Sequence, residues 1–164
     1  AESVERVVEG RRNVAGFVYG AVLAVAVVTA VSSDHSAGAA YVLGGVVITA
    51  IVFWLVESYA VTLQIRLRRS GRSVWADARA AAVHEATLPE AAILPSVPLL
   101  LAALDVLQRD TGILLAQLVG LAELFFSGYA VARVLEQPQL KAIASGGFCL
   151  ALGAVMVVLK AALH

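Results

Sequence analysis

Five runs of apolar residues follow one another along the chain, separated by shorter segments that carry most of the charges. Each run is close to the ~20 residues that an α-helix needs to cross the hydrocarbon core of a bilayer. The pattern therefore predicts an all-α, polytopic membrane protein, organised as a single domain of five transmembrane helices. We expect these helices at residues 14–31, 41–63, 88–107, 112–131 and 142–159.

The second apolar run is the one around which we expect the others to be arranged. It carries Glu57 deep inside an otherwise apolar helix and leads into a cluster of arginines within residues 66–72. A carboxylate at such a depth costs a few kcal/mol or more, so it usually faces the protein interior or a water-filled path. Because one helix cannot shelter this group alone, the neighbouring helices are expected to surround it.

Composition supports a membrane protein and excludes several other classes. Of the 164 residues, 60% are hydrophobic and the mean hydropathy is +0.87, which leaves too little polar sequence to cover a soluble domain. Lys+Arg and Asp+Glu balance at 12 each, so we expect no nucleic-acid partner. The single cysteine, Cys149, excludes an intramolecular disulfide and a cysteine metal cluster. Without a cleavage pattern before it, the first run is expected to be a retained helix rather than a signal peptide.

Basic residues indicate how the helices are oriented. If the runs alternate in direction, only Arg109 and Lys160 of the 12 Lys and Arg residues lie on the side opposite the N-terminus. Cytoplasmic loops carry an excess of Lys and Arg, so the N-terminus is predicted to be cytoplasmic and the C-terminus external. The Ala-, Val- and Arg-rich composition suits a high-GC bacterium and hence its plasma membrane. Asp34 and His35, in a short external loop, are interpreted as solvated residues rather than metal ligands.

The segment 73–87 is predicted to form a short helix at the membrane interface, anchored by a tryptophan. The residues expected to face lipid are Trp75, Ala78, Ala82 and Val83, and those expected to face water are Asp77, His84 and Glu85. The polar side has two interpretations. With Glu90 nearby, His84 and Glu85 form a cytoplasmic entrance for a metal ion or proton; alternatively, these three residues are a solvated face at the membrane boundary.

The third run contains three prolines, which predict an irregular helix. Pro89 suits a first helical turn. Pro95 and Pro98 remove backbone donors within the span, so they predict a kink. In lipid the carbonyl groups freed by a kink need partners, which places this stretch against protein or water.

The fourth run has a face of small residues interrupted by one acidic residue. The face consists of Ala116, Gly120, Glu123, Ser127 and Ala130. Such a face packs against other helices rather than lipid. Glu123 lies about 15 Å from Arg133 by helix rise and Glu57 about 13 Å from Arg66. We therefore expect the two carboxylates at nearly the same level, able to meet in one cavity.

The first and fifth runs carry similar strips of small residues, which favour close helix packing. The strip in the first run is Gly16, Gly20 and Ala24, with Tyr19 beside it, and that in the fifth is Ala142, Gly146, Cys149, Gly153 and Met156. Cys149 and Met156 are candidate soft metal ligands. We interpret them instead as residues that fill gaps between helices.

Two interpretations of Glu57 and Glu123 stay open. In the first, each carboxyl is protonated and bonds to a neighbouring hydroxyl, such as that of Ser58, Tyr59, Ser127 or Tyr129. In the second, the pair binds a hard or borderline cation such as Fe²⁺ or Mn²⁺, or exchanges protons for one. No phosphate-binding loop, Ser–His–Asp arrangement or dinucleotide fingerprint occurs in the sequence. We therefore expect no enzyme activity and no permanently bound cofactor.

Three stretches of the sequence resemble the vacuolar iron transporter family. Glu57-Ser58-Tyr59, followed by IRLRRSGR, resembles the glutamate-tyrosine signature and charged extension that end the family's second span. Pro95-Ser96-Val97-Pro98 resembles the Pro-x-x-Pro step of its third span. The last two runs and the basic loop between them also resemble the family's last two spans.

The resemblance implies a reduced, divergent family member that moves a divalent metal cation, Fe²⁺ or Mn²⁺, with protons as the coupled ion. It implies a homodimer whose ion path lies at the two-fold interface, near the Gly16/Gly20/Ala24 strip, with Glu57 as the central ligand. Glu123 and Tyr59 would lie along the same path. Tyr19 occupies the position of the family's first-span aspartate, and the family's cytoplasmic metal-binding domain is missing between spans two and three. The alternative function is a non-transporting membrane scaffold or partner subunit with the same fold.

Overall fold

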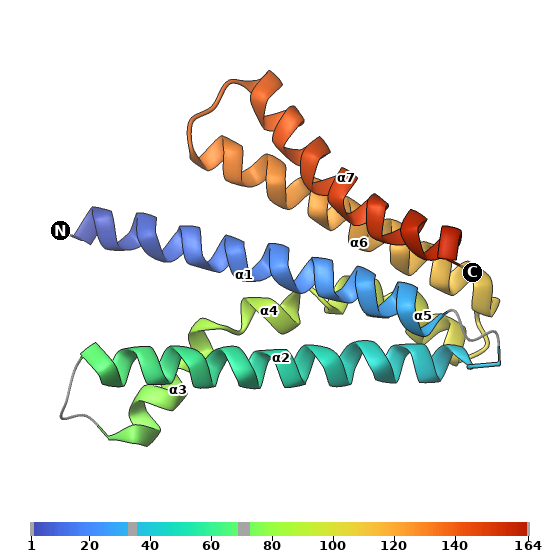
Figure 1. The fold of residues 1–164 in the computed structure, drawn as a ribbon, viewed down its shortest axis with the longest axis horizontal. Coiled ribbons are helices and arrows are strands. Elements are labelled where there is room, and N and C mark those ends of the chain that lie inside the picture. The colour runs from blue at the N-terminus through green and yellow to red at the C-terminus, as the bar shows by residue number, and fades with distance from the viewer. Residues whose placement is uncertain (1, 33–35, 69–72, 164) are drawn as a thin grey trace.

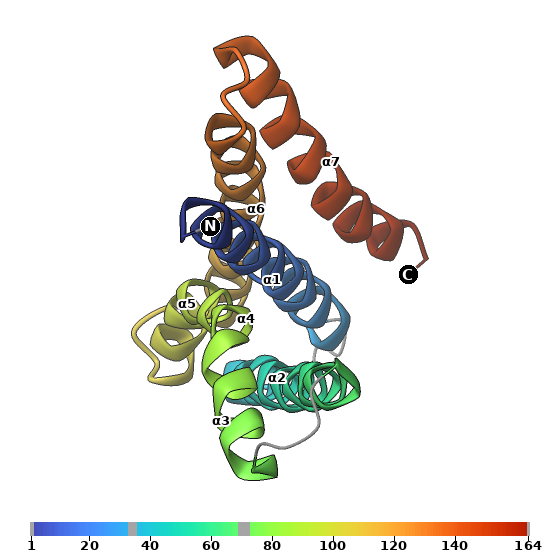
Figure 2. The same cartoon turned by 90° about the vertical axis from the view of Figure 1, so that its left-hand side faces the viewer.

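The computed structural model describes residues 2–32, 36–68 and 73–163, and within these ranges every regular element is a helix. The helices, in chain order, are α1 (Glu2–Val31), α2 (Ala39–Arg68), α3 (Val74–His84), α4 (Thr87–Glu90), α5 (Ile93–Ala103), α6 (Arg109–Val134) and α7 (Gln139–Leu163). The long helices run roughly along one axis, with α1 between α2 and α6 (Figures 1 and 2). The predicted all-α fold class is thus confirmed. The loop residues Asp34 and His35 lie outside the described ranges.

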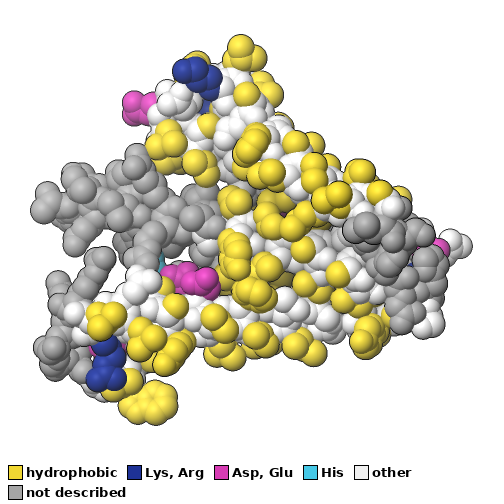
Figure 3. All heavy atoms as spheres, viewed as in Figure 1, with side chains coloured by type: hydrophobic (Ala, Val, Ile, Leu, Met, Phe, Trp, Pro, Cys, Tyr) yellow, Lys and Arg dark blue, Asp and Glu magenta, His cyan; other side chains and the backbone are white. Residues whose placement is uncertain are grey.

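Three helices in the described part of the chain are long and apolar enough to cross a membrane: α2, α6 and α7. A fourth span results if the bent segment from Val74 to Ala103 crosses as one unit. The first predicted span corresponds to the shorter apolar part of α1, Gly16–Val31. Hydrophobic side chains cover the middle of the face drawn in Figure 3, while most of its charged side chains lie toward one end. The chain is therefore an integral membrane protein in character, with an outer surface compatible with lipid.

The third predicted span is not one continuous helix. It is interrupted between α4 and α5, and the segments on the two sides of the break meet at 56°. Proline lacks an N–H and its ring clashes with the carbonyl four residues earlier, which for Pro95 belongs to Ala91. The break therefore falls one turn before Pro95, whereas Pro98 lies inside α5 without ending it. The amide and the hydroxyl of Ser96 both donate to the carbonyl oxygen of Ala92, at 3.2 and 2.6 Å.

This span also ends earlier than residue 107. Helix α5 ends at Ala103, and Asp105 adopts a left-handed conformation with a φ of 57°. The amides of Asp105 and Val106 then donate back to the carbonyls of Ala102 and Leu101, at 3.3 and 2.9 Å. This hydrogen-bond pattern closes a helix by satisfying its last carbonyls. A signal for it was absent from the sequence because the left-handed residue is an aspartate rather than the usual glycine.

Helix α3 forms where the interfacial helix was predicted, and it crosses α2 in both views (Figures 1 and 2). Trp75 is 83% exposed on this helix. Asp77, which we expected to face water, is instead buried at 3% exposure. The reason is that α3 packs on α2, where the indole Nε1 of Trp54 donates to the carbonyl of Ala82 at 2.9 Å. The face that carries Asp77 and Ala81 is therefore covered by protein.

The core lies where α1, α2, α5 and α6 meet. Apart from Leu99, its buried side chains are small or β-branched, and include Ala24, Val28, Val42, Val46 and Ala116. A β-carbon added at Gly120 of α6 would collide with the side chain of Val25 of α1. One added at Gly128 would lie 2.7 Å from the sulfur of Cys149 on α7. Small residues therefore set the spacing of α6 from both neighbours, as the stripe on the fourth run predicted, although Ala130 at its end is exposed.

Arg109 ties the start of α6 to the connection between α1 and α2. Its Nε donates to the carbonyl of Ala37 at 2.7 Å, and one of its terminal nitrogens to that of Ser32 at 3.4 Å. Another terminal nitrogen pairs with the Asp110 carboxylate at 3.0 Å. The bond to Ser32 satisfies a carbonyl at the negative C-terminal end of α1, and the bond to Ala37 holds the loop just before α2. A basic residue on the predicted external side thus has a structural reason to be there.

Candidate cation pocket between α1, α2 and α4

Two acidic side chains come together in a pocket of about 250 Å³ beside the middle of α1 and the C-terminal half of α2. Glu57 contributes from α2 and Glu85 from the turn between α3 and α4. Among the described residues, the lining also contains the polar side chains of Tyr19 and Gln64, together with Gly16, Val61 and Leu88. Glu57 and Glu85 are both half-buried, so their carboxylates lie at the edge of the protein interior and in contact with the pocket.

Helical periodicity explains why α2 supplies several members of this pocket. Glu57, Val61 and Gln64 are spaced at i, i+4 and i+7, so they share one face of the helix. Sequence reasoning missed Gln64, although this spacing from Glu57 was a signal for it. Ser58, which follows Glu57 on α2, is turned toward the interior, and its buried hydroxyl has no hydrogen-bond partner.

Glycines of α1 bring the second acidic residue close to the first. A β-carbon at Gly20 would collide with the main-chain carbonyl of Leu88. One at Gly16 would lie 2.9 Å from the hydroxyl of Thr87 and 4.0 Å from a carboxylate oxygen of Glu85. Only a glycine surface lets α4 approach α1 this closely. The Gly16/Gly20/Ala24 strip, expected near an interface between two copies, therefore packs within the chain and positions Glu85.

The two tyrosines predicted along the ion path lie in different surroundings. Tyr19 lines the pocket, and its ring packs edge-on against Phe53, with centroids 6.0 Å apart and planes at 70°. Tyr59 is 66% exposed on the outer surface of α2 and is not among the pocket residues. Of the predicted pair, Tyr19 is thus the one positioned to touch a ligand bound beside Glu57.

The three residues of the predicted cytoplasmic entrance do not form one cluster. Glu85 lines the pocket, whereas the half-buried His84 and the exposed Glu90 are not among its lining residues. The described part of the chain contains no group of three or more His, Cys, Asp or Glu side chains able to hold a metal ion. A single described chain therefore offers two carboxylates for a cation, supplemented by neutral oxygen atoms.

Glu123 lies elsewhere, although its predicted depth matched that of Glu57. Its side chain is 8% exposed, and it is not among the residues that line the pocket. Helix α1 lies between α2, which carries Glu57, and α6, which carries Glu123 (Figure 2). The two carboxylates therefore do not share this pocket. Helical periodicity does not specify the rotation of α6 relative to α2, so the sequence did not show that the two glutamates line different spaces.

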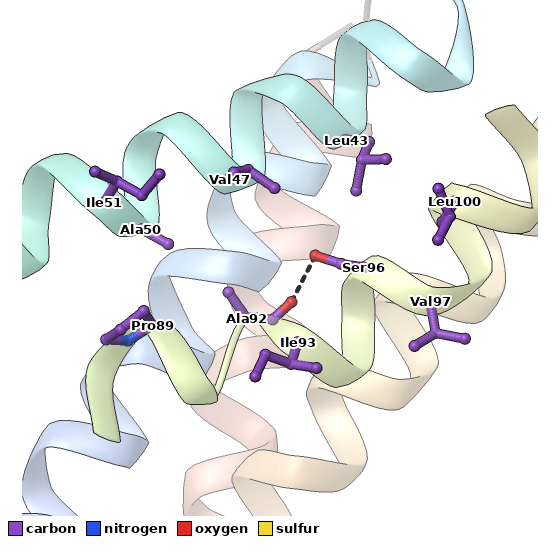
Figure 4. A pocket seen from close by; sticks show the side chains of 10 residues that line it. All are labelled: Leu43, Val47, Ala50, Ile51, Pro89, Ala92, Ile93, Ser96, Val97 and Leu100. Atoms are coloured by element: carbon purple, nitrogen blue, oxygen red, sulfur yellow. Dashed lines mark hydrogen bonds between the residues drawn. The ribbon is translucent and has the colours of Figure 1, made fainter. Parts of the chain in front are cut away.

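The break between α4 and α5 opens a second cavity, of about 440 Å³, against α2. Side chains from α2 face those from α4 and α5 across it (Figure 4). Its lining residues are Leu43, Val47, Ala50, Ile51, Pro89, Ala92, Ile93, Ser96, Val97 and Leu100. The one hydroxyl among them, that of Ser96, already donates to Ala92. This cavity suits hydrocarbon rather than an ion, so Pro95 and Pro98 shape an apolar groove and not the cation pocket.

Comparison with known proteins adds no further constraint on the pocket. The chain matches no family model, no curated protein and no solved structure.

Proposed function

We propose that this chain is a membrane transporter of a divalent metal cation, Fe²⁺ or Mn²⁺, and that Glu57 and Glu85 are its principal ligands. The observation that carries this proposal is the pocket in which the two carboxylates, the Gln64 amide and the Tyr19 phenol meet. Carboxylate and amide oxygens suit hard and borderline divalent ions. Two ionised carboxylates also supply the charge that a divalent cation needs for neutralisation.

The proposal includes a homodimer of a reduced, divergent member of the vacuolar iron transporter family, located in a bacterial plasma membrane. It rests on the resemblance carried by Glu57-Ser58-Tyr59 and by the Pro95-to-Pro98 step. A second copy would supply further oxygen ligands to an ion held by only two carboxylates. The excess of basic residues on one side favours a cytoplasmic N-terminus and an external C-terminus, with five helical crossings. Protons are the proposed coupled ion.

The test is metal flux into proteoliposomes containing the purified chain. Glu57→Gln and Glu85→Gln each remove one negative charge from the pocket and retain its shape, so each is expected to reduce Mn²⁺ uptake by about tenfold or more. Glu90→Gln is the matched control, because Glu90 is near Glu85 in sequence but exposed and outside the pocket lining. Uptake by Glu57→Gln equal to that of the parent chain would refute the assignment.

A non-transporting membrane scaffold or partner subunit is the second candidate. The observation that favours it is the Tyr19 ring, which packs on Phe53 where the resembling family has an aspartate. A phenol is a weaker ligand than a carboxylate for divalent ions. If the scaffold proposal is correct, the parent chain and Glu57→Gln will show the same background flux. Tyr19→Asp would then be the informative variant, because it restores a third carboxylate to the pocket.

A further inference from the structure

Glu123 has an environment unlike that of the pocket carboxylates. Among the side chains that the structure describes, it is the carboxylate whose two oxygens are both buried without a hydrogen-bond partner. The residue is 8% exposed and lies on the interior face of α6, between Gly120 and Ser127. This group is not used by the proposed cation pocket, so its presence inside the bundle requires a separate explanation.

The surroundings of Glu123 are apolar. One helical turn away, Gly120 lies against Val25 of α1. A β-carbon added at Gly120 would also lie 3.8 Å from the ring of Pro95. The next residue, Leu124, is buried in a cluster with Ala21, Val25 and Ala91. The hydroxyl of Ser127 donates to the main-chain oxygen of Glu123 at 2.6 Å and not to its carboxylate. The nearest hydroxyl along the helix is therefore already engaged with the backbone.

Among the described side chains of the helices packed on α6, we find no basic group beside the Glu123 carboxyl. On α1, Tyr19 points into the pocket, and Thr29 accepts a hydrogen bond from Gln117 at 3.3 Å. Cys149 of α7 lies against Gly128, and Glu90, ahead of α5, is exposed. Besides Glu123, the charged residues of α6 and α7 with described side chains lie near the helix ends and are Arg109, Asp110, Arg133 and Lys141.

An ionised carboxylate in this position would be a buried charge without a counter-ion. Such a charge costs far more than a neutral polar group, and proteins avoid it by neutralising the group. A divalent metal fits less well here than in the Glu57 pocket, because the described residues packed beside this part of α6 supply no second carboxylate. A single proton neutralises one carboxylate completely and needs no further ligand.

We propose that Glu123 is a proton-binding site distinct from the Glu57 pocket. Its side chain is a neutral carboxylic acid while it is buried between α1 and α6. Its proton exchanges with water only when α1 and α6 separate far enough to expose the carboxyl. Because α1 also lines the cation pocket through Gly16 and Tyr19, movement of one helix would alter both sites. The proposal does not rest on metal transport, since it concerns the occupancy of Glu123 in the metal-free protein.

The test is infrared spectroscopy of the full chain in lipid nanodiscs without divalent metal. The parent protein at neutral pH is expected to show the carbonyl stretching band of a protonated carboxylic acid, and Glu123→Gln is expected to lose it. In Glu90→Gln the band should be unchanged. If Glu123→Gln fails to fold, Glu123→Asp serves instead, because it retains the acid and should shift the band in frequency.

Three outcomes would overturn the assignment. The first is a parent-minus-variant spectrum that contains only carboxylate bands, which would mean that Glu123 is ionised. The second is loss of the acid band when Na⁺ or Mn²⁺ is added at constant pH, which would identify a cation site. The third is a complete shift of the band on immediate transfer to D₂O, which would show that the carboxyl is open to water. A slow shift supports an enclosed proton.

Discussion

Glu57 and Glu123 are two carboxylates that the sequence places at nearly the same depth, yet the fold gives them opposite surroundings. Glu57 lines a pocket of about 250 Å³ with a second carboxylate and two neutral polar side chains. Glu123 is enclosed by small and apolar residues, without a hydrogen-bond partner for its carboxylate. The difference arises from α1, which lies between the helices that carry them. An acidic residue in a membrane helix therefore acquires its chemistry from the facing helix.

The same helix also supports the two sites in different ways. Toward α4 it presents Gly16 and Gly20, which allow backbone-to-backbone approach and bring Glu85 to Glu57. Toward α6 it presents Ala21 and Val25, which fill the space beside Gly120 and Leu124. The first surface lets the backbone at Leu88 approach α1, and this approach places Glu85 beside Gly16 at the edge of the pocket. Along the second surface these side chains pack closely, and the Glu123 side chain is buried beside them.

The largest expected effect comes from a substitution that forces α1 and α4 apart. Gly20→Val places a branched side chain where the Leu88 carbonyl lies, so α4 must move away and carry Glu85 with it. Overpacking of this kind costs about 1–3 kcal/mol or more. We expect a lower thermal unfolding midpoint in detergent and loss of Mn²⁺ uptake. Gly44→Ala is the control, because an added β-carbon there meets nothing within 4 Å. Equal unfolding midpoints for the two variants would contradict the observed packing.

The second prediction uses stability to separate the two carboxylates. Glu123→Leu replaces an unpartnered buried group with an apolar side chain of similar volume, so we expect it to stabilise the protein by about 1–3 kcal/mol. Glu57→Leu replaces a side chain that already contacts an open pocket, so we expect a much smaller change in the free energy of unfolding. Reversible unfolding in bicelles would measure both. A strongly destabilised Glu123→Leu protein would mean that the carboxyl has a partner that holds the helices together.

The sequence predicted the character of the fold better than the arrangement of its sites. Apolar length and small-residue spacing identified the long helices and the packing face of α6, because both are local properties of one segment. The break at Ala91 and Ala92 was predicted only as a kink, and the burial of Asp77 was not anticipated. Both depend on how α3 and α4 fold back on α2 and α1, which local periodicity does not specify.

The third prediction concerns access of water to the two positions. In a Cys149→Ser background, Glu57→Cys should react with a membrane-impermeant maleimide about tenfold or more faster than Glu123→Cys, because thiol reactivity requires exposure of the sulfur. Labelling after denaturation controls for the total amount of each thiol. Similar rates at the two positions in the folded protein would show that α1 does not seal Glu123, and would remove the main difference between the sites.

The smallest expected effect is that of Ser127→Ala. The hydroxyl of Ser127 donates to the main-chain oxygen of Glu123, which already belongs to the helix, so its loss should change stability by about 0.5–1 kcal/mol at most. The carboxylic acid band of Glu123 should keep its frequency, because the hydroxyl does not bond to the carboxyl. A shift of the band in Ser127→Ala would mean that, in the membrane, the Ser127 hydroxyl forms a hydrogen bond with the Glu123 carboxyl. Glu123 would then be a hydrogen-bonded structural group, and its contrast with Glu57 would be one of partners rather than of access to water.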